Sequence, residues 1–215
     1  MFKPTDGDAM RFCIIVGSSR ADGQSRGVCE LISDHLAGVA VCDFVYLREH
    51  RIELCDADNA CMHMPCAIND DVHAIVRRML AADALVYMPV VHAYGTNSRF
   101  QAFLERVGYG HLRPLERPLK DKLAGVVVIG RRYGHTAVYS QVVLNVLLNK
   151  MVLVGSGFPA TFMGISGGRR DGEATEALHE MLNRMIELSA RIATPRVPPA
   201  ARLDAPLEET WRIIG

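Results

Sequence analysis

The sequence feature that most constrains the fold is an apolar run that ends abruptly in a polar, glycine-containing loop. Residues 12–16 read Phe-Cys-Ile-Ile-Val, and residues 17–25 read Gly-Ser-Ser-Arg-Ala-Asp-Gly-Gln-Ser. A short, wholly apolar run is typical of a strand that is covered on both faces. From Gln24 onward apolar residues recur at helical spacing, so the loop joins a buried strand to a helix.

The composition of this loop favours a phosphate site. A Walker A loop needs Gly-Lys followed by Ser or Thr, and the dinucleotide fingerprint needs Gly-x-Gly-x-x-Gly. Residues 17–25 contain neither, but they offer a helix start with Ser18, Ser19, Arg20 and Ser25. Such donors suit the terminal phosphate monoester of FMN. The alternative is an ordinary strand-to-helix turn in which Ser and Asp act as caps.

Length and composition favour one domain and a small-molecule partner. The 215 residues are 49% hydrophobic, so we expect one domain at 1–195 and a Pro-rich tail at 196–215, packed on the domain or on a neighbouring subunit. Balanced charge, with 24 basic and 24 acidic residues, argues against nucleic acid and membrane surfaces as partners. Without a secretory signal or an apolar run of roughly 18 residues, we expect a cytoplasmic protein. Its six cysteines are then expected to be reduced thiols.

Strand-like and helix-like segments alternate along the chain. After the first pair, strands are expected at 39–47, 84–90, 123–129 and 157–163, and helices at 70–82, 99–107, 137–154 and 173–192. This alternation predicts an α/β fold with an open parallel sheet and helices on both faces. Polar loops follow the first, third and fourth strands. Ligands bind beyond the carboxyl ends of such strands, and the order 2-1-3-4-5 makes these three loops adjacent.

Four segments, in this order, resemble the NAD(P)H-dependent FMN reductases, which are related to the iron–sulfur flavoproteins. They are the loop at 17–25, Asp70-Asp71 at a helix start, Met88-Pro-Val-Val-His-Ala-Tyr-Gly-Thr-Asn-Ser98, and Phe103-Leu-Glu-Arg106. The resemblance covers residues 11–165. It implies a three-layer flavodoxin-like sandwich with a five-stranded parallel sheet in order 2-1-3-4-5. It also implies non-covalent FMN, NADPH or NADH as electron donor, and a homodimer or homotetramer.

The resemblance further implies three groups of FMN contacts. The phosphate loop would use Ser18, Arg20, Gln24 and Ser25. The loop beside the ribityl chain and the isoalloxazine would use Pro89, Val90, Val91, His92, Tyr94, Gly95, Thr96 and Asn97. The loop on the other edge of the ring would use Gly130, Arg131, Arg132 and Gly134. Many relatives have Pro-x-Tyr where this chain has Pro89-Val-Val91, which leaves His92 or Tyr94 to supply the aromatic ring.

Few side chains are needed for the chemistry that the resemblance implies, because hydride passes directly between the stacked nicotinamide and flavin rings. The protein positions the two rings and supplies the electrostatic field around them. Arg131 or Arg132 would stabilise negative charge on the reduced ring or hold the 2′-phosphate of NADPH; alternatively, both are solvated loop residues. His92 and His135 would hydrogen-bond the ring or protonate an acceptor; alternatively, they have a simple loop role. The sequence identifies no further catalytic residue.

A segment with three cysteines, Cys55, Cys61 and Cys66, precedes the helix at 70–82. The related iron–sulfur flavoproteins carry a Cys-x2-Cys-x2-Cys-x4-7-Cys motif there, but here Asp58 replaces the second cysteine. A [4Fe–4S] cluster would therefore lack one thiolate ligand. A zinc site that includes His63 would have atypical spacing. We expect three reduced thiols and no bound metal.

The function expected from these features is an FMN-dependent NAD(P)H oxidoreductase that reduces free flavin, a quinone or another small acceptor. The alternative is an FMN-binding electron carrier for protein partners, including one of the iron–sulfur flavoprotein type. Flavodoxin carriers are typically strongly acidic, whereas this chain is balanced. The helix expected at 137–154 is apolar nearly all round. Burial on a second side then predicts a homodimer or a pair of dimers.

Overall fold

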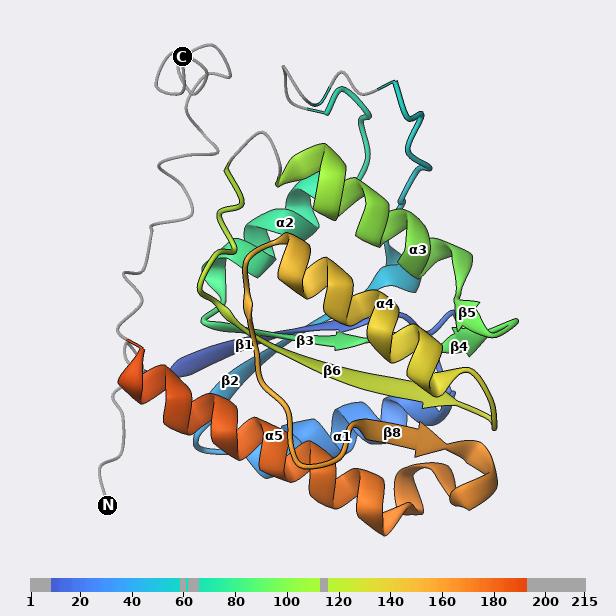
Figure 1. Cartoon of the computed structure of the whole chain (residues 1–215), viewed down its shortest axis with the longest axis vertical. Coiled ribbons are helices and arrows are strands. Elements are labelled where there is room, and N and C mark those ends of the chain that lie inside the picture. The colour runs from blue at the N-terminus through green and yellow to red at the C-terminus, as the bar shows by residue number, and fades with distance from the viewer. Residues whose placement is uncertain (1–8, 59–60, 62–65, 113–115, 193–215) are drawn as a thin grey trace.

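A parallel sheet runs through the middle of the molecule and helices cover both of its faces, as the computed structural model in Figure 1 shows. The structure describes residues 9–58, 61, 66–112 and 116–192, so the expected tail at 196–215 and His63 lie outside the described residues. The strands of the sheet are β1 (Met10–Val16), β2 (Ala40–Tyr46), β3 (Ala84–Met88), β6 (Leu123–Gly130), β7 (Val152–Leu153) and β8 (Ala160–Met163). The helices are α1 (Gln24–Leu36), α2 (Val72–Ala81), α3 (Ser98–Glu105), α4 (His135–Leu148) and α5 (Gly172–Arg191).

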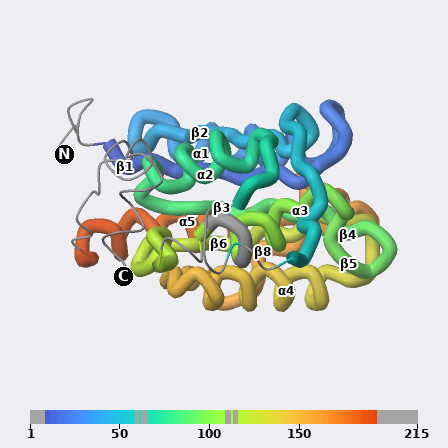
Figure 2. The backbone as a smooth tube through the Cα atoms, turned by 90° about the horizontal axis from the view of Figure 1, so that it is seen from above, coloured from blue at the N-terminus to red at the C-terminus, as the bar shows by residue number. Residues whose placement is uncertain are grey.

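The order of the strands is β2-β1-β3-β6-β7, all parallel, and β8 also pairs with β6. This confirms the predicted order 2-1-3-4-5, because β7 and β8 together take the fifth position. Val16 is level with Met88 at the carboxyl ends of β1 and β3. Beyond β3 the chain forms a small antiparallel hairpin of β4 (Val91–His92) and β5 (Gly95–Thr96). Seen from above in Figure 2, this hairpin lies at the end of the sheet where α4 begins.

Alternation along the central strands divides the core into two halves. Cys13 and Ile15 of β1 face a cluster that includes α2, α3 and α4, whereas Ile14 and Val16 face α1 and α5. The side chains of β1 from Phe12 onward are fully buried. A strand that is covered on both faces needs apolar residues on both, which is why the run at 12–16 shows no polar alternation.

The helix expected at 137–154 is shorter in the structure. It ends at Leu148, and Lys150 adopts a left-handed conformation with φ +56°. Val152 and Leu153 then pair with β6 as β7, and the expected strand at 157–163 is reduced to β8. An apolar run cannot by itself distinguish a buried helical turn from a buried strand.

The helix expected at 99–107 also ends early, at Glu105, and the chain continues as a π-helix over Arg106–His111. The third strand ends at Met88, two residues before the expected end, because Pro89 has no N–H to extend the ladder. Its neighbour Val90 still forms an isolated bridge to Ile129. The remaining boundaries differ from expectation by one or two residues. Within the described part of the chain, no helix has the length and apolar character needed to cross a membrane.

Candidate functional site

The loop between β1 and α1 folds back over the start of α1. Ser18 is buried. Its Oγ donates to the carbonyl of Arg20 (3.1 Å) and accepts from the Arg20 N–H (3.2 Å). A Cβ on Gly23 would lie 3.5 Å from both Arg20 Nε and Ser18 Oγ, so the guanidinium and the hydroxyl meet beside the helix start. Ser25 is also buried.

No side chain in the described part of the chain caps the first turn of α1. Gly23 is its N-cap, and neither serine nor aspartate makes a capping hydrogen bond. The alternative in which Ser and Asp act as the caps therefore does not describe this helix start. Because the first N–H groups of a helix lack intrahelical partners and carry partial positive charge, this helix start is suited to an anion.

The β4–β5 hairpin follows β3 and contains unusual backbone. Ala93 and Tyr94 both lie in the left-handed region, with φ +45° and +69°. Residues other than glycine adopt this conformation at a cost, roughly 1–2 kcal/mol each, and such strain concentrates at functional sites. Thr96 adds a second anomaly, since its Oγ1 is buried and has no hydrogen-bond partner among the residues described here. A buried hydroxyl of this kind is available to a ligand.

Asn97 joins this hairpin to the β1–α1 loop. Its Nδ2 donates to the carbonyl of Gly17, and its Oδ1 accepts from the N–H of Phe100 (2.9 Å) and so caps α3. The N–H of Gly17 donates to the carbonyl of Met88 (2.9 Å). A Cβ on Gly17 would lie 2.6 Å from the Phe100 ring, which is why only glycine fits where these elements converge.

The loop between β6 and α4 touches the same hairpin. Gly134, the N-cap of α4, has φ +86°, and a Cβ there would lie 3.0 Å from the backbone of Tyr94. Arg131 and Arg132 are exposed and make no ion pair within the described part of the chain. Three expected loops therefore meet at one end of the sheet.

The remaining expected contacts differ in their accessibility. Pro89 accepts from the N–H of Ile129 (3.1 Å), and Val91 packs beside Gly130 and Gly134. His135 is buried, with its Nε2 3.3 Å from the carbonyl oxygen of Phe162. His92 is exposed, and Gly95 of the same hairpin faces open space. Of the two candidate histidines, His92 alone is accessible to solvent.

A fourth segment, residues 164–170 after β8, belongs to the same group of loops and was not expected. The N–H of Ile165 donates to the carbonyl of Arg131 (3.1 Å). Cβ atoms on Gly164 and Gly168 would each lie 2.9 Å from the Gln24 side chain, so this segment holds Gln24 in place. The glycines and paired arginines of this stretch were a usable signal, because they resemble the composition of the other three loops.

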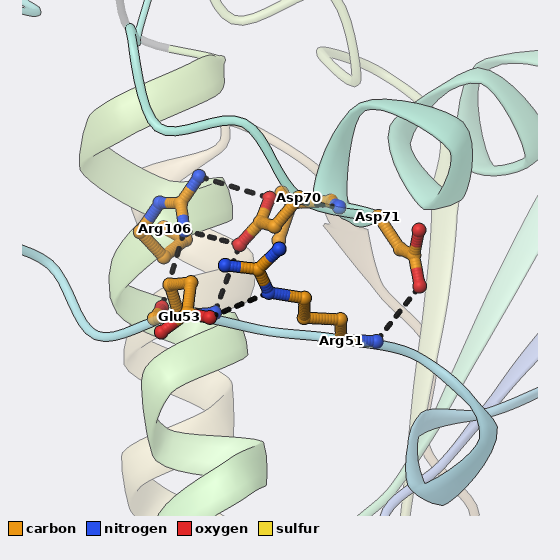
Figure 3. Close-up of polar contacts among 6 residues, drawn as sticks. Arg51, Glu53, Asp70, Asp71 and Arg106 are labelled. Atoms are coloured by element: carbon orange, nitrogen blue, oxygen red, sulfur yellow. Dashed lines mark hydrogen bonds and ion pairs between the residues drawn. The ribbon is translucent and has the colours of Figure 1, made fainter.

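Near the cysteine segment, Asp70 and Arg106 form an ion pair from which solvent is fully excluded (Figure 3). Nη1 of Arg106 donates to Asp70 Oδ2 (2.6 Å) and to the carbonyl of Glu53 (3.1 Å), while Nη2 donates to Asp70 Oδ1 (3.2 Å). The N–H groups of Glu53 and Val72 also donate to the Asp70 carboxylate. Burial would raise the pKa of Asp70, but these donors outweigh it and lower the pKa.

Cys55, Cys61 and Cys66 are each half-buried, and no disulfide joins them. Among the residues that the structure describes, no cluster of His, Cys, Asp and Glu has a metal-binding arrangement. Burial would lower the pKa of Arg106, but Asp70 and the adjacent Cys66 raise it. The two motifs that carried the resemblance at 70–71 and 103–106 are thus joined directly, and the cysteine segment runs beside that junction.

Known flavoproteins share this fold. The crystal structure of RosB with a bound 8-demethyl-8-formylriboflavin-5'-phosphate intermediate has a TM-score of 0.71 and 16% identity, and the match covers 96% of this chain and 88% of RosB. The oxidoreductase FerB from Paracoccus denitrificans has a TM-score of 0.61 and 13% identity, with 85% of this chain and 98% of FerB covered. These likenesses establish a flavodoxin-like fold.

Sequence comparison gives a relative and a family. An iron–sulfur flavoprotein from Methanocaldococcus jannaschii is 26% identical over 171 residues, which is 76% of this chain and 86% of that protein. The model of the NADPH-dependent FMN reductases matches residues 10–164, which is more than half of the chain. The chain therefore belongs to the NADPH-dependent FMN reductase family, a family of flavin-dependent oxidoreductases.

Proposed function

We propose that this protein binds FMN at the meeting point of the β1–α1, β3–α3 and β6–α4 loops and transfers electrons from NADPH or NADH to a small acceptor. The observation that carries the proposal is the start of α1 beside Ser18 and Arg20, where Gly23 is the N-cap and makes no side-chain capping hydrogen bond. The buried, unpartnered Thr96 hydroxyl supports it, because FMN offers polar atoms to such a group. The residues present therefore fit FMN.

Each loop has a distinct task in this proposal. Ser18, Ser25, Arg20 and the N–H groups of α1 hold the phosphate, since a dianion gains most from several donors around one helix start. Asn97 fixes the hairpin relative to that loop through its bonds to Gly17 and Phe100. FMN held by these loops would supply the redox chemistry, which is hydride acceptance from nicotinamide and electron release to an acceptor.

Arg131 and Arg132 supply the positive field of the site. Both are exposed, and neither is neutralised by an ion pair with a described residue. Charge of this kind attracts a nucleotide phosphate and stabilises negative charge that develops on a reduced ring. The acceptor is a free flavin, a quinone or another small molecule rather than a protein partner, because the chain lacks the excess of acidic residues that is typical of flavodoxin carriers.

We further propose that the working form is a homodimer or a pair of dimers. Helix α4 contains no charged residue, yet Leu144 and Leu147 on it are 67% and 56% exposed. An exposed apolar stripe on an uncharged helix is typical of a surface that packs on another subunit. A second copy of this chain is the occupant we expect, with α4 packed on its symmetry mate.

Anaerobic titration of the FMN-loaded protein with NADPH and with NADH tests the enzyme proposal. We expect loss of the oxidised-flavin absorbance with at least one nucleotide, and its recovery when a quinone is added. A flavin that stays oxidised with both nucleotides, but is reduced by dithionite, would contradict the enzyme and favour the carrier. The dithionite control shows that the flavin itself is competent.

A further inference from the structure

Two tyrosine rings stand exposed at the end of the sheet where the proposed flavin loops meet. Tyr94 of the hairpin is 71% exposed, and Tyr133 of the β6–α4 loop is 59% exposed. Their ring centroids are 6.5 Å apart and their planes differ by 29°, so the two rings form a nearly parallel pair. Neither phenol hydroxyl makes a hydrogen bond to the described residues that would explain its position.

The backbone holds Tyr94 in this exposed position at a cost. It lies at φ +69°, directly after Ala93 at φ +45°, and the loop of Tyr133 reaches it through Gly134. A Cβ at Gly134 would lie only 3.0 Å from the Tyr94 backbone, a tighter contact than most side chains make, and the φ of +86° also favours glycine there. Retained backbone strain is typical of functional loops, and here it accompanies an aromatic ring that is exposed to solvent.

Arg132 completes the surface with a cation. Its guanidinium carbon lies 5.2 Å from the centroid of the Tyr133 ring, within the range of a cation–π contact. Because no acid pairs with it among the described residues, Arg132 remains available to an anionic group. A flat apolar ring surface beside a free guanidinium favours a planar aromatic molecule that carries a negative charge.

We propose that Tyr94, Tyr133 and Arg132 form the acceptor-binding surface of the protein and that they select planar aromatic quinones with an anionic substituent. The inference rests on the proposed function, since the surface lies beside the loops assigned to FMN. The tyrosine rings stack on the quinone, and Arg132 binds its charged group. Reduction of the quinone to the hydroquinone takes up two electrons and two protons, which reduced FMN (FMNH₂) gives up as it returns to the oxidised form.

Calorimetric titration of the oxidised, FMN-loaded protein with anthraquinone-2-sulfonate tests the surface without turnover. Tyr133→Leu and Tyr94→Asn should each weaken binding by roughly 2- to 10-fold, the range expected for loss of one aromatic contact. Asn is chosen at position 94 because it tolerates the left-handed conformation. Tyr133→Phe should retain the affinity, because the ring rather than the hydroxyl makes the contact.

The charge preference has its own comparison. Arg132→Gln should weaken the binding of anthraquinone-2-sulfonate, but not the binding of the neutral 2-(hydroxymethyl)anthraquinone. Arg48→Gln is the matched control, because Arg48 also lies over a tyrosine ring, that of Tyr46 at 4.4 Å, but follows β2 rather than β6. Unchanged affinity in all three loop variants, or equal loss of both anthraquinones in Arg132→Gln, would overturn the proposal.

Failure of this surface can be distinguished from failure of the proposed donor. Protein reduced with dithionite is mixed with the same quinone, and the rate of flavin reoxidation is followed in each variant with unchanged FMN content. If no nicotinamide reduces the flavin but Tyr133→Leu still slows reoxidation, the donor is wrong and the acceptor surface stands. If nicotinamide reduces the flavin and no loop variant changes affinity or reoxidation, the acceptor surface is wrong.

Discussion

Arg106 and Asp70 pair through two hydrogen bonds, of 2.6 and 3.2 Å, with neither side chain exposed to solvent. The pair joins the start of the π-helix after α3 to the residues that lead into α2 (Figure 3). It also binds the carbonyl of Glu53, so the segment that contains Cys55 is attached at the same point.

Asp70→Asn should lower the free energy of unfolding by about 3–5 kcal/mol, because it leaves the Arg106 charge buried without its partner. Asp71→Asn is the matched control, since its neighbouring carboxylate is half-exposed and accepts from the N–H of Arg51. Urea unfolding of both variants measures the difference. Equal and small losses would show that burial of the pair contributes nothing beyond an ordinary surface interaction.

Stability should also fall as the pH falls through the histidine range. The rings of His35 on α1 and His179 on α5 stack with centroids 4.1 Å apart, and His35 Nε2 lies 2.8 Å from Asn183 Oδ1. Burial first, and then the charge of His35, lower the pKa of His179. The folded state therefore binds fewer protons than the unfolded state, and stability is lost as the pH falls below about 6.5.

Thermal unfolding of the wild type and His179→Leu between neutral pH and the onset of acid denaturation tests this sign. The stability of the variant should depend less strongly on pH than that of the wild type as the pH falls from neutral through the histidine range. An equal or steeper loss of stability in the variant would contradict the lowered pKa of His179.

Leu147→Glu should dissociate the protein, because it places a charge in the centre of the apolar stripe of α4. Phe158→Glu is the matched control: Phe158 is 68% exposed and lies between β7 and β8. Light scattering at micromolar concentration compares the two variants. A wild type that is monomeric and holds FMN would contradict the dimer directly.

Protein purified without oxygen should contain no stoichiometric iron or zinc, because Asp58 stands where a fourth thiolate would be needed. Cys61→Ser and Cys66→Ser together should leave the FMN content unchanged. The test is informative because a relative that is 26% identical to this chain is an iron–sulfur flavoprotein. Near-stoichiometric iron with a brown chromophore would move the protein to that class.

Local patterns predicted most of the architecture. The apolar runs at 12–16 and 123–129 are buried strands, and the polar loops that follow them meet the hairpin after β3. The pattern failed at 149–154, where burial makes helix and strand equally apolar and only the left-handed turn at Lys150 ends the helix. Lysine gives no sequence signal for such a turn, whereas glycine or asparagine would.

Contacts between distant residues were the least predictable. The sequence motifs include both Asp70 and Arg106, but their pairing joins positions 36 residues apart and depends on how α2 and α3 pack. The loop after β8 reaches Gln24 from far along the chain in the same way. Sequence patterns report which residues are buried or polar, whereas these contacts depend on the three-dimensional arrangement of the elements.

The central claim is that the β1–α1 loop holds the phosphate of FMN. The most direct test compares the affinities of the apoprotein for FMN and riboflavin in wild type and in Arg20→Glu, by fluorescence titration. The substitution places an anion beside a dianion. The affinity for FMN should therefore fall by well over tenfold, where tenfold equals about 1.4 kcal/mol, while the affinity for riboflavin should change little. Equal loss of both ligands, or unchanged FMN affinity, would contradict the claim and locate the phosphate elsewhere.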